Sequence, residues 1–163
     1  MNAVIIYYSL TGKTELVARA IGKTLNAELR RVEDLRKKGV TGRISGAIGA
    51  VRGACGKIKP MDFKIDNYDL VFIGSPVWVS RPTPAINTFI SKANFAGKQV
   101  VLFVTMGGWG DKRAIKEMSD VVKSKGGKII DSFAIRTGGV DDEKIIEEGI
   151  AIGRRRKDAP AGI

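Results

Sequence analysis

The sequence predicts a single three-layer α/β domain with a doubly wound, five-stranded parallel sheet. Five strand-like runs alternate with four stretches of helical periodicity over 163 residues. Two runs, 70–73 and 100–104, are apolar at every position, as expected for strands that helices cover on both faces. A hydrophobic content of 44% can supply one sizeable core, so we expect one domain over 1–157 and a frayed tail over 158–163. The expected strands are 3–8, 28–32, 69–74, 99–105 and 128–135, and the expected helices are 13–25, 84–92, 112–125 and 141–155.

The first strand runs into a hydroxyl-rich turn that opens the first helix. The turn consists of Ser9, Leu10, Thr11, Gly12, Lys13 and Thr14. The first N–H groups of a helix have no partner within it, and its N-terminus carries partial positive charge, so such a junction can bind a phosphate. The alternative is that Ser9 or Thr11 only caps the helix.

The same turn also matches the end of a nucleoside-triphosphate loop, G-x-x-x-x-G-K-[ST]. That loop needs glycine where Tyr7 lies, and a second Gly-Lys-Thr at 22–24 needs glycine where Val17 lies. No later apolar strand ends in the aspartate that would bind magnesium. The sequence therefore disfavours a triphosphate site.

Between the second and third strands, the segment 41–59 has an unusual pattern. Glycines recur at helical spacing over 42–53, opposite an apolar stripe that includes Cys55. Each glycine weakens a helix by roughly 1 kcal/mol relative to alanine. Two interpretations stay open: a poorly ordered connection, or a helix whose glycine face admits a partner or substrate. We expect Cys55 to be an inert core residue.

Both tryptophans follow apolar strands. The loop after the third strand contains Pro76, Val77, Trp78 and Val79, and the loop after the fourth contains Thr105, Met106, Gly107, Gly108, Trp109 and Gly110. Ligands of an open parallel sheet bind beyond the carboxyl ends of its strands. A phosphate-binding turn beside flat apolar side chains and free backbone amides suits a phosphorylated planar heterocycle. Either tryptophan could instead anchor its loop to the core.

The chain is strongly basic, with 28 Lys and Arg against 17 Asp and Glu and a formal charge of +11. This charge favours acidic partners and gives weak, salt-sensitive affinity for polyanions. We interpret the run 154–157 as a helix end whose cations complement the helix dipole. Because aromatic residues concentrate in the two loops and not among basic residues, we expect no dedicated nucleic-acid binding.

Some functional classes are excluded by composition. One cysteine and no histidine exclude an internal disulfide, the usual structural zinc sites and imidazole-based catalysis. No apolar run approaches the roughly 20 residues that span a bilayer, and no signal pattern precedes the first strand. We expect a cytoplasmic protein without a membrane anchor, a metal site or a catalytic residue.

These segments resemble those of the flavodoxin family, and the likeness covers almost the whole chain. The family's phosphate loop, roughly [ST]-x-T-G-x-T, is met by Ser9, Thr11, Gly12 and Thr14. The resemblance implies strand order 2-1-3-4-5, with flavin mononucleotide (FMN) at the switch point, as known for flavodoxin itself. It implies that 9–14 hold the phosphate, that 76–79 line one side of the isoalloxazine with Trp78 stacking on it, and that 105–110 flank the other side.

The resemblance also implies an electron carrier whose flavin supplies the redox chemistry. Flavodoxins that carry electrons are typically acidic, whereas this chain is basic, so we expect an acidic redox partner such as an iron–sulfur protein or a flavin reductase. The alternative is an NAD(P)H-dependent flavin or quinone reductase on the same fold. A binding module without flavin is disfavoured because all three loops retain the features that binding needs.

Overall fold

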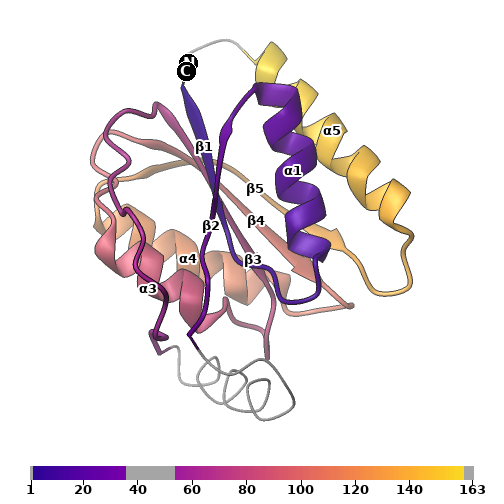
Figure 1. Cartoon of the computed structure of the whole chain (residues 1–163), viewed down its shortest axis with the longest axis horizontal. Coiled ribbons are helices and arrows are strands. Elements are labelled where there is room, and N and C mark those ends of the chain that lie inside the picture. The colour runs from indigo at the N-terminus through magenta and orange to yellow at the C-terminus, as the bar shows by residue number, and fades with distance from the viewer. Residues whose placement is uncertain (1, 36–53, 160–163) are drawn as a thin grey trace.

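The computed structural model describes residues 2–35 and 54–159, and Figure 1 shows the alternating strands and helices that the sequence predicts. Every expected element is present, with bounds shifted by three residues or fewer. The strands are β1 (Ala3–Tyr7), β2 (Glu28–Arg31), β3 (Leu70–Pro76), β4 (Gln99–Met106) and β5 (Lys128–Arg136). The helices are α1 (Lys13–Leu25), α3 (Pro84–Lys92), α4 (Asp111–Ser124) and α5 (Asp142–Asp158).

The sheet has the order β2-β1-β3-β4-β5, which confirms the predicted flavodoxin-like topology. All four neighbouring pairs are parallel. The carboxyl ends of the strands therefore share one edge, which we call the carboxyl end, and the opposite edge is the amino end. Each helix starts at the carboxyl end and finishes at the amino end. Helices α1, α3 and α4 run back to the start of the next strand, and α5 packs alongside α1, with Gly153 against Thr24 near the ends of both helices.

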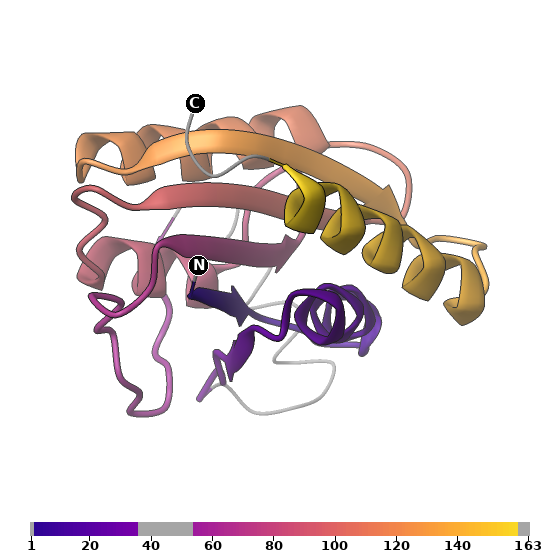
Figure 2. The ribbon, with the colours of Figure 1, turned by 90° about the horizontal axis from the view of Figure 1, so that it is seen from above.

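Two layers of helices cover the sheet. Helices α1 and α5 pack together on one face, and α3 and α4 lie on the other (Figures 1 and 2). Along β1, Ile5 faces the α1/α5 layer, whereas Ile6 faces the α3/α4 layer, and both are fully buried. The unbroken apolar strands therefore supply two separate cores, as the absence of alternation predicts.

Strand β3 runs two residues beyond its expected end, to Pro76. Its last residues continue to pair with β4, as Pro76 is opposite Thr105. Gly74 faces β1, where it accepts the Tyr8 N–H at 3.1 Å, and Pro76 faces the same side two residues later. Strand β1 has already ended at Tyr7, so the missing N–H of Pro76 costs no ladder hydrogen bond.

The glycine-rich pattern at 42–53 lies outside the described residues. The described part, 54–59, is not helical, so the helix interpretation is wrong there. Its backbone pairs instead with the chain after β2, through N–H bonds of Leu35 (2.9 Å) and Lys59 (2.8 Å). Cys55 is exposed, so its predicted core position is also wrong, since the apolar stripe depended on a helix that 54–59 does not form.

Helix α5 extends to Asp158, so the basic run 154–157 forms the end of this helix, as predicted. The expected tail thus begins with a residue that is still helical. Within the described ranges, no helix is both long and apolar enough to cross a membrane.

Candidate functional site

A pocket of about 410 Å³ opens at the carboxyl end of the sheet. Three predicted segments meet in it, although they are far apart in the sequence. Its lining residues are Leu10, Thr11, Lys13, Thr14, Pro76, Val77, Trp78, Val79, Thr105, Met106, Gly107 and Thr137. Among the predicted site residues, Ser9, Gly12, Gly108, Trp109 and Gly110 do not line it.

The Ser9 side chain fixes the backbone of the turn through hydrogen bonds. It is buried, and its Oγ accepts the N–H groups of Gly12 at 3.1 Å and Glu15 at 3.3 Å. The N-cap residue itself is Gly12, and not Ser9 or Thr11 as the capping interpretation expected, but Ser9 satisfies one N–H of the first turn of α1 from outside the helix. Gly12 turns the chain with φ +92°, a conformation that glycine adopts without strain.

The Ser9 contacts leave other donors of the same turn unused. In the ranges that the structure describes, the backbone N–H groups of Thr11, Lys13 and Thr14 form no hydrogen bond. All three residues line the pocket. Donors at a helix N-terminus, where the dipole also favours negative charge, form an anion-binding site.

Side chains from other elements fix this turn. The Thr14 and Thr105 hydroxyls lie 2.7 Å apart and are buried, so they tie the turn to the end of β4. The Lys13 ammonium pairs with Asp142 at 2.5 Å, in the first turn of α5. Arg31, at the end of β2, donates to the Ser9 carbonyl at 3.0 Å and to the Glu15 carboxylate at 2.7 Å.

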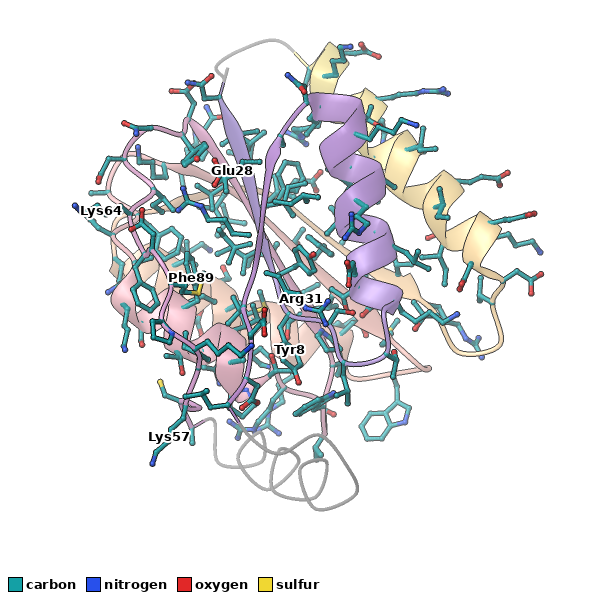
Figure 3. The ribbon with its side chains drawn as sticks, in the orientation of Figure 1. Tyr8, Glu28, Arg31, Lys57, Lys64 and Phe89 are labelled. Carbon is teal, nitrogen blue, oxygen red and sulfur yellow. The ribbon has the colours of Figure 1, made fainter. Side chains whose placement is uncertain are left out.

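Aromatic side chains lie beneath and beside the turn. Figure 3 shows Tyr8 and Arg31 near the start of α1, with Glu28 toward the other end of β2. Burial, followed by the nearby Glu15 carboxylate, raises the pKa of Tyr7, so its phenol stays neutral near pH 7. The Tyr8 ring meets Trp78 edge-on, with centroids 5.8 Å apart and planes at 89°.

Trp78 begins a tight turn that forms one wall of the pocket. Trp78 and Arg81 exchange two backbone hydrogen bonds of 2.9 and 3.0 Å. The two residues between them, Val79 and Ser80, have φ of 49° and 61°. A β-branched residue such as valine rarely adopts this conformation, so the turn is strained and its neighbours must hold it. Trp78 packs against the core and also lines the pocket. Its position therefore agrees with a role in anchoring the loop and also allows contact with a ligand.

The loop after β4 forms the opposite wall. Met106 and Gly107 line the pocket, whereas Trp109 has 76% of its surface exposed. Gly110 touches the first wall: a Cβ built on it would lie 2.8 Å from the Ser80 Cα. The two walls are therefore in direct contact at the rim.

Sequence reasoning missed Thr137, which follows β5. Its N–H donates to the Met106 carbonyl at 2.8 Å, so the ends of β4 and β5 are joined at the pocket. The sequence held a signal for it, because a glycine pair follows shortly after β5, at Gly138 and Gly139, as another follows β4, at Gly107 and Gly108. Arg31 was missed as well, and no motif around it marks its contact with the turn.

Comparisons with known proteins agree with this arrangement. A sequence model of the flavodoxin family matches residues 45–139. An uncharacterised protein of Methanocaldococcus jannaschii is 29% identical over 138 residues, which cover 83% of this chain and 75% of that protein.

Solved structures share the fold. The Lactobacillus acidophilus flavoprotein in complex with FMN superimposes with a TM-score of 0.66 at 23% identity, over 90% of this chain and 97% of that one. Oxidised flavodoxin 2 of Bacillus cereus gives a TM-score of 0.63 at 19% identity, over 96% of this chain and 99% of that one. At these identities the likeness shows the fold alone. The family match extends over more than half of the sequence, and the chain belongs to the flavodoxin family.

Proposed function

We propose that the pocket binds FMN and that the protein carries electrons through it. The observation that carries this proposal is the row of unpaired backbone N–H groups at Thr11, Lys13 and Thr14, beside an aromatic wall at Trp78. A phosphorylated ring system needs both features in one place. The FMN complex of the similar Lactobacillus acidophilus protein supports the same ligand.

Each segment takes a separate part of the ligand in this proposal. The turn 9–14 binds the phosphate, with Ser9 and Gly12 shaping the turn and the remaining residues contacting the ligand. Residues 76–79 form one side of the ring site, and 105–107 form the other, with Thr137 supporting Met106. Gly108, Trp109 and Gly110 belong to the rim and not to the ring site.

When bound, FMN supplies the one- and two-electron chemistry. The protein's own groups bind the ligand, orient it and exclude water from its buried side. Backbone amides and hydroxyls stay neutral, so the turn offsets phosphate charge through dipoles. The Lys13 ammonium, although paired with Asp142, adds a positive charge at the pocket.

The rim of the pocket is suited to a protein partner. Leu10 is 40% exposed, Val79 51% and Trp109 76%, and they come from three different loops. Tryptophan is strongly enriched among residues that dominate binding energy at interfaces. Two cations beside the rim are paired, Lys13 with Asp142 and Arg81 with Glu117. We infer that the formal charge of +11 raises the encounter rate with an acidic redox protein, while the apolar side chains of the rim, and not the charge, select the place of contact.

Kinetics with and without a nicotinamide test the carrier proposal. Holoprotein mixed with NADH or NADPH should not turn over quinones or free flavin, but it should exchange electrons rapidly with a reduced acidic iron–sulfur protein. The Trp109→Ala variant should slow this exchange without changing FMN affinity, and Val121→Ala, an exposed apolar position on α4, is the matched control. Saturable NAD(P)H oxidation at roughly 1–10³ s⁻¹ would instead identify a flavin or quinone reductase.

A further inference from the structure

The unpaired positive charge of the described residues is concentrated away from the pocket. All four helices finish at the amino end of the sheet, and each has a basic residue in its last turn. Arg156 pairs with Asp131 at 2.8 Å. The other last-turn cations, and Arg154 one residue before them on α5, are exposed, and none has a carboxylate within 4.0 Å in the described ranges. We define the amino-end face by these six residues: Lys23, Lys92, Lys123, Arg154, Arg155 and Lys157.

Helix dipoles account for only part of this concentration. Each helix C-terminus carries about half a negative charge, so four of them contribute about two units. The amino-end face has six full positive charges, three of them on α5 alone. One cation would complement the α5 dipole, and three exceed it.

Carboxylates at the same end do not neutralise these six residues. Asp131 pairs with Arg156 at 2.8 Å, and Asp120 pairs with Lys116 at 2.6 Å. Three further carboxylates lie at this end without a salt bridge in the described ranges: Asp66 and Asp69 just before β3, and Asp158 at the end of α5. Six cations against these three carboxylates leave the face with a positive excess.

The α1 and α5 cations lie close together. A Cβ built on Gly153 would lie 2.7 Å from the Thr24 Cβ, so the two helices touch at their ends. This contact places Arg154 and Lys23 next to the same helix crossing. Lys92 and Lys123 belong to the helix layer on the other side of the sheet.

We propose that the amino-end face docks reversibly on an anionic phospholipid bilayer. Its cations lie on both helix layers, on either side of the sheet, and such a spread suits a flat partner better than one that follows a groove. The two half-buried rings near this end are already engaged: Lys92 lies over the Phe63 ring at 5.1 Å, and the Tyr68 hydroxyl donates a hydrogen bond to Glu28. Among the described residues, the exposed large apolar side chains are Leu10, Leu35, Val79, Trp109 and Val121, so no fully exposed aromatic ring lies there to stack on bases. Binding rests on charge and involves little insertion, because only Val121 lies near this end.

The orientation has a functional consequence. The pocket opens at the carboxyl end, so a protein docked by its amino end presents the pocket to the aqueous phase. A redox partner can then contact the apolar rim while the protein stays docked on the membrane. The docking itself requires no bound flavin, so it stands or fails independently of the proposed electron transfer.

Vesicle sedimentation tests the proposal. The protein should bind vesicles of phosphatidylcholine containing about one-third phosphatidylglycerol, and not vesicles of phosphatidylcholine alone. Binding should vanish as salt shortens the Debye length from about 10 Å at 0.1 M to about 3 Å at 1 M. Binding to both kinds of vesicle, or to neither at 0.05 M salt, would overturn the proposal.

Two triple variants with the same change in net charge separate location from total charge. Arg154→Gln/Arg155→Gln/Lys157→Gln should weaken partitioning roughly a hundredfold, at about fivefold per cation. Lys112→Gln/Arg136→Gln/Lys144→Gln removes three exposed cations at the carboxyl end and should change it less than about threefold. Equal losses of partitioning in the two triple variants would show that binding depends on net charge alone, and would contradict docking through the amino-end face. Lys23→Gln/Lys123→Gln, on two other helices, should cost roughly twenty-five-fold and provides a second variant if the first fails to fold.

Tryptophan fluorescence tests the orientation. Both tryptophans, Trp78 and Trp109, lie at the carboxyl end. Spin-labelled lipids should therefore leave their emission unchanged when the protein is vesicle-bound, and iodide should still quench it. Quenching by the lipids would show docking through the pocket instead. Tighter binding to a DNA duplex than to anionic vesicles at equal salt would identify a nucleic acid as the partner and overturn the membrane proposal.

Discussion

The two ends of the sheet use their polar groups in opposite ways. At the carboxyl end, the cations next to the pocket, Lys13 and Arg81, are paired with Asp142 and Glu117, while backbone N–H groups of the first turn form no hydrogen bond in the described chain. At the amino end, the backbone groups continue into helices and strands, while cations such as Lys23 and Arg154 have no carboxylate in that same part of the chain. Unpaired N–H donors that line a pocket can select a specific ligand, because hydrogen bonds depend on direction. Unpaired cations on a surface attract any polyanion or anionic surface.

The largest expected effect concerns the carboxyl end. Thr11→Ala/Thr14→Ala should weaken FMN binding by about 2–4 kcal/mol, because two charge-assisted hydrogen bonds to the phosphate are lost and partly replaced by water. Riboflavin binding should change little. Thr105→Val is the control, since it removes the partner of the Thr14 hydroxyl but keeps that hydroxyl. Fluorescence titration measures the FMN affinity of both variants. If Thr105→Val lowers this affinity as much as the double variant does, the contact between the Thr14 and Thr105 hydroxyls holds the turn in place, and the Thr14 hydroxyl is not a phosphate ligand.

Alanine substitutions at two glycines of positive φ, one at each end of the sheet, allow a direct comparison of the two ends. Gly110, at the rim, touches Ser80, whereas Gly97, at the amino end, has open space around its missing side chain. Gly97→Ala should cost about 1–2 kcal/mol of unfolding free energy, from backbone strain alone. Gly110→Ala should cost about 2–3 kcal/mol, because overpacking adds to the strain. Urea unfolding measures both, and only Gly110→Ala should also reduce FMN affinity.

A smaller effect is expected at the aromatic wall. Trp78→Ala should lower FMN affinity by about 1 kcal/mol and raise the residual fluorescence of bound flavin. Because Trp78 also contacts Tyr8 edge-on, some thermal stability should be lost as well. Unchanged bound-state fluorescence with a lower melting temperature would leave Trp78 as an anchor only.

The smallest effect lies at the amino end, at Glu28. The Tyr68 hydroxyl and then Arg30 donate hydrogen bonds to its carboxylate and lower its pKa. A lowered folded-state pKa means that this contribution is present above the unfolded pKa of about 4.3 and is lost as pH falls through the folded value. Glu28 is about half exposed, so solvent screening limits the contribution to a few tenths of a kcal/mol.

Tyr68→Phe tests this contribution. Its destabilisation, measured by urea unfolding, should be fully present at pH 6 and shrink below about pH 4. FMN affinity should not change, because the pocket lies at the other end of the sheet. A destabilisation that grows in acid would contradict the assignment.

The sequence predicted the elements well because β1, β3 and β4 contain unbroken apolar runs and each helix has a clear start. It predicted the pocket walls for a similar reason, as Trp78 and Gly107 lie directly after such strands. It misassigned residues whose position depends on partners distant in the chain. Cys55 lies where backbone pairing after β2 holds an extended segment, and Thr137 enters the pocket through a bond to Met106.

Charge shows the same limit. The sequence gives the total of +11 but not where unpaired cations lie. Pairing of Lys13 with Asp142 depends on a contact between the first turn and α5, which sequence spacing does not encode. The parallel topology then brings the last turns of four helices to one end.

The relative affinity of FMN and riboflavin for the flavin-free protein tests the central claim most directly. If the unpaired N–H groups of Thr11, Lys13 and Thr14 bind the phosphate, FMN should bind at least about a hundredfold more tightly, since each charge-assisted hydrogen bond contributes roughly 1.5–3 kcal/mol. Quenching of flavin fluorescence on titration measures both constants under one set of conditions. Equal affinities would contradict the account, because the turn would then have no anion to bind.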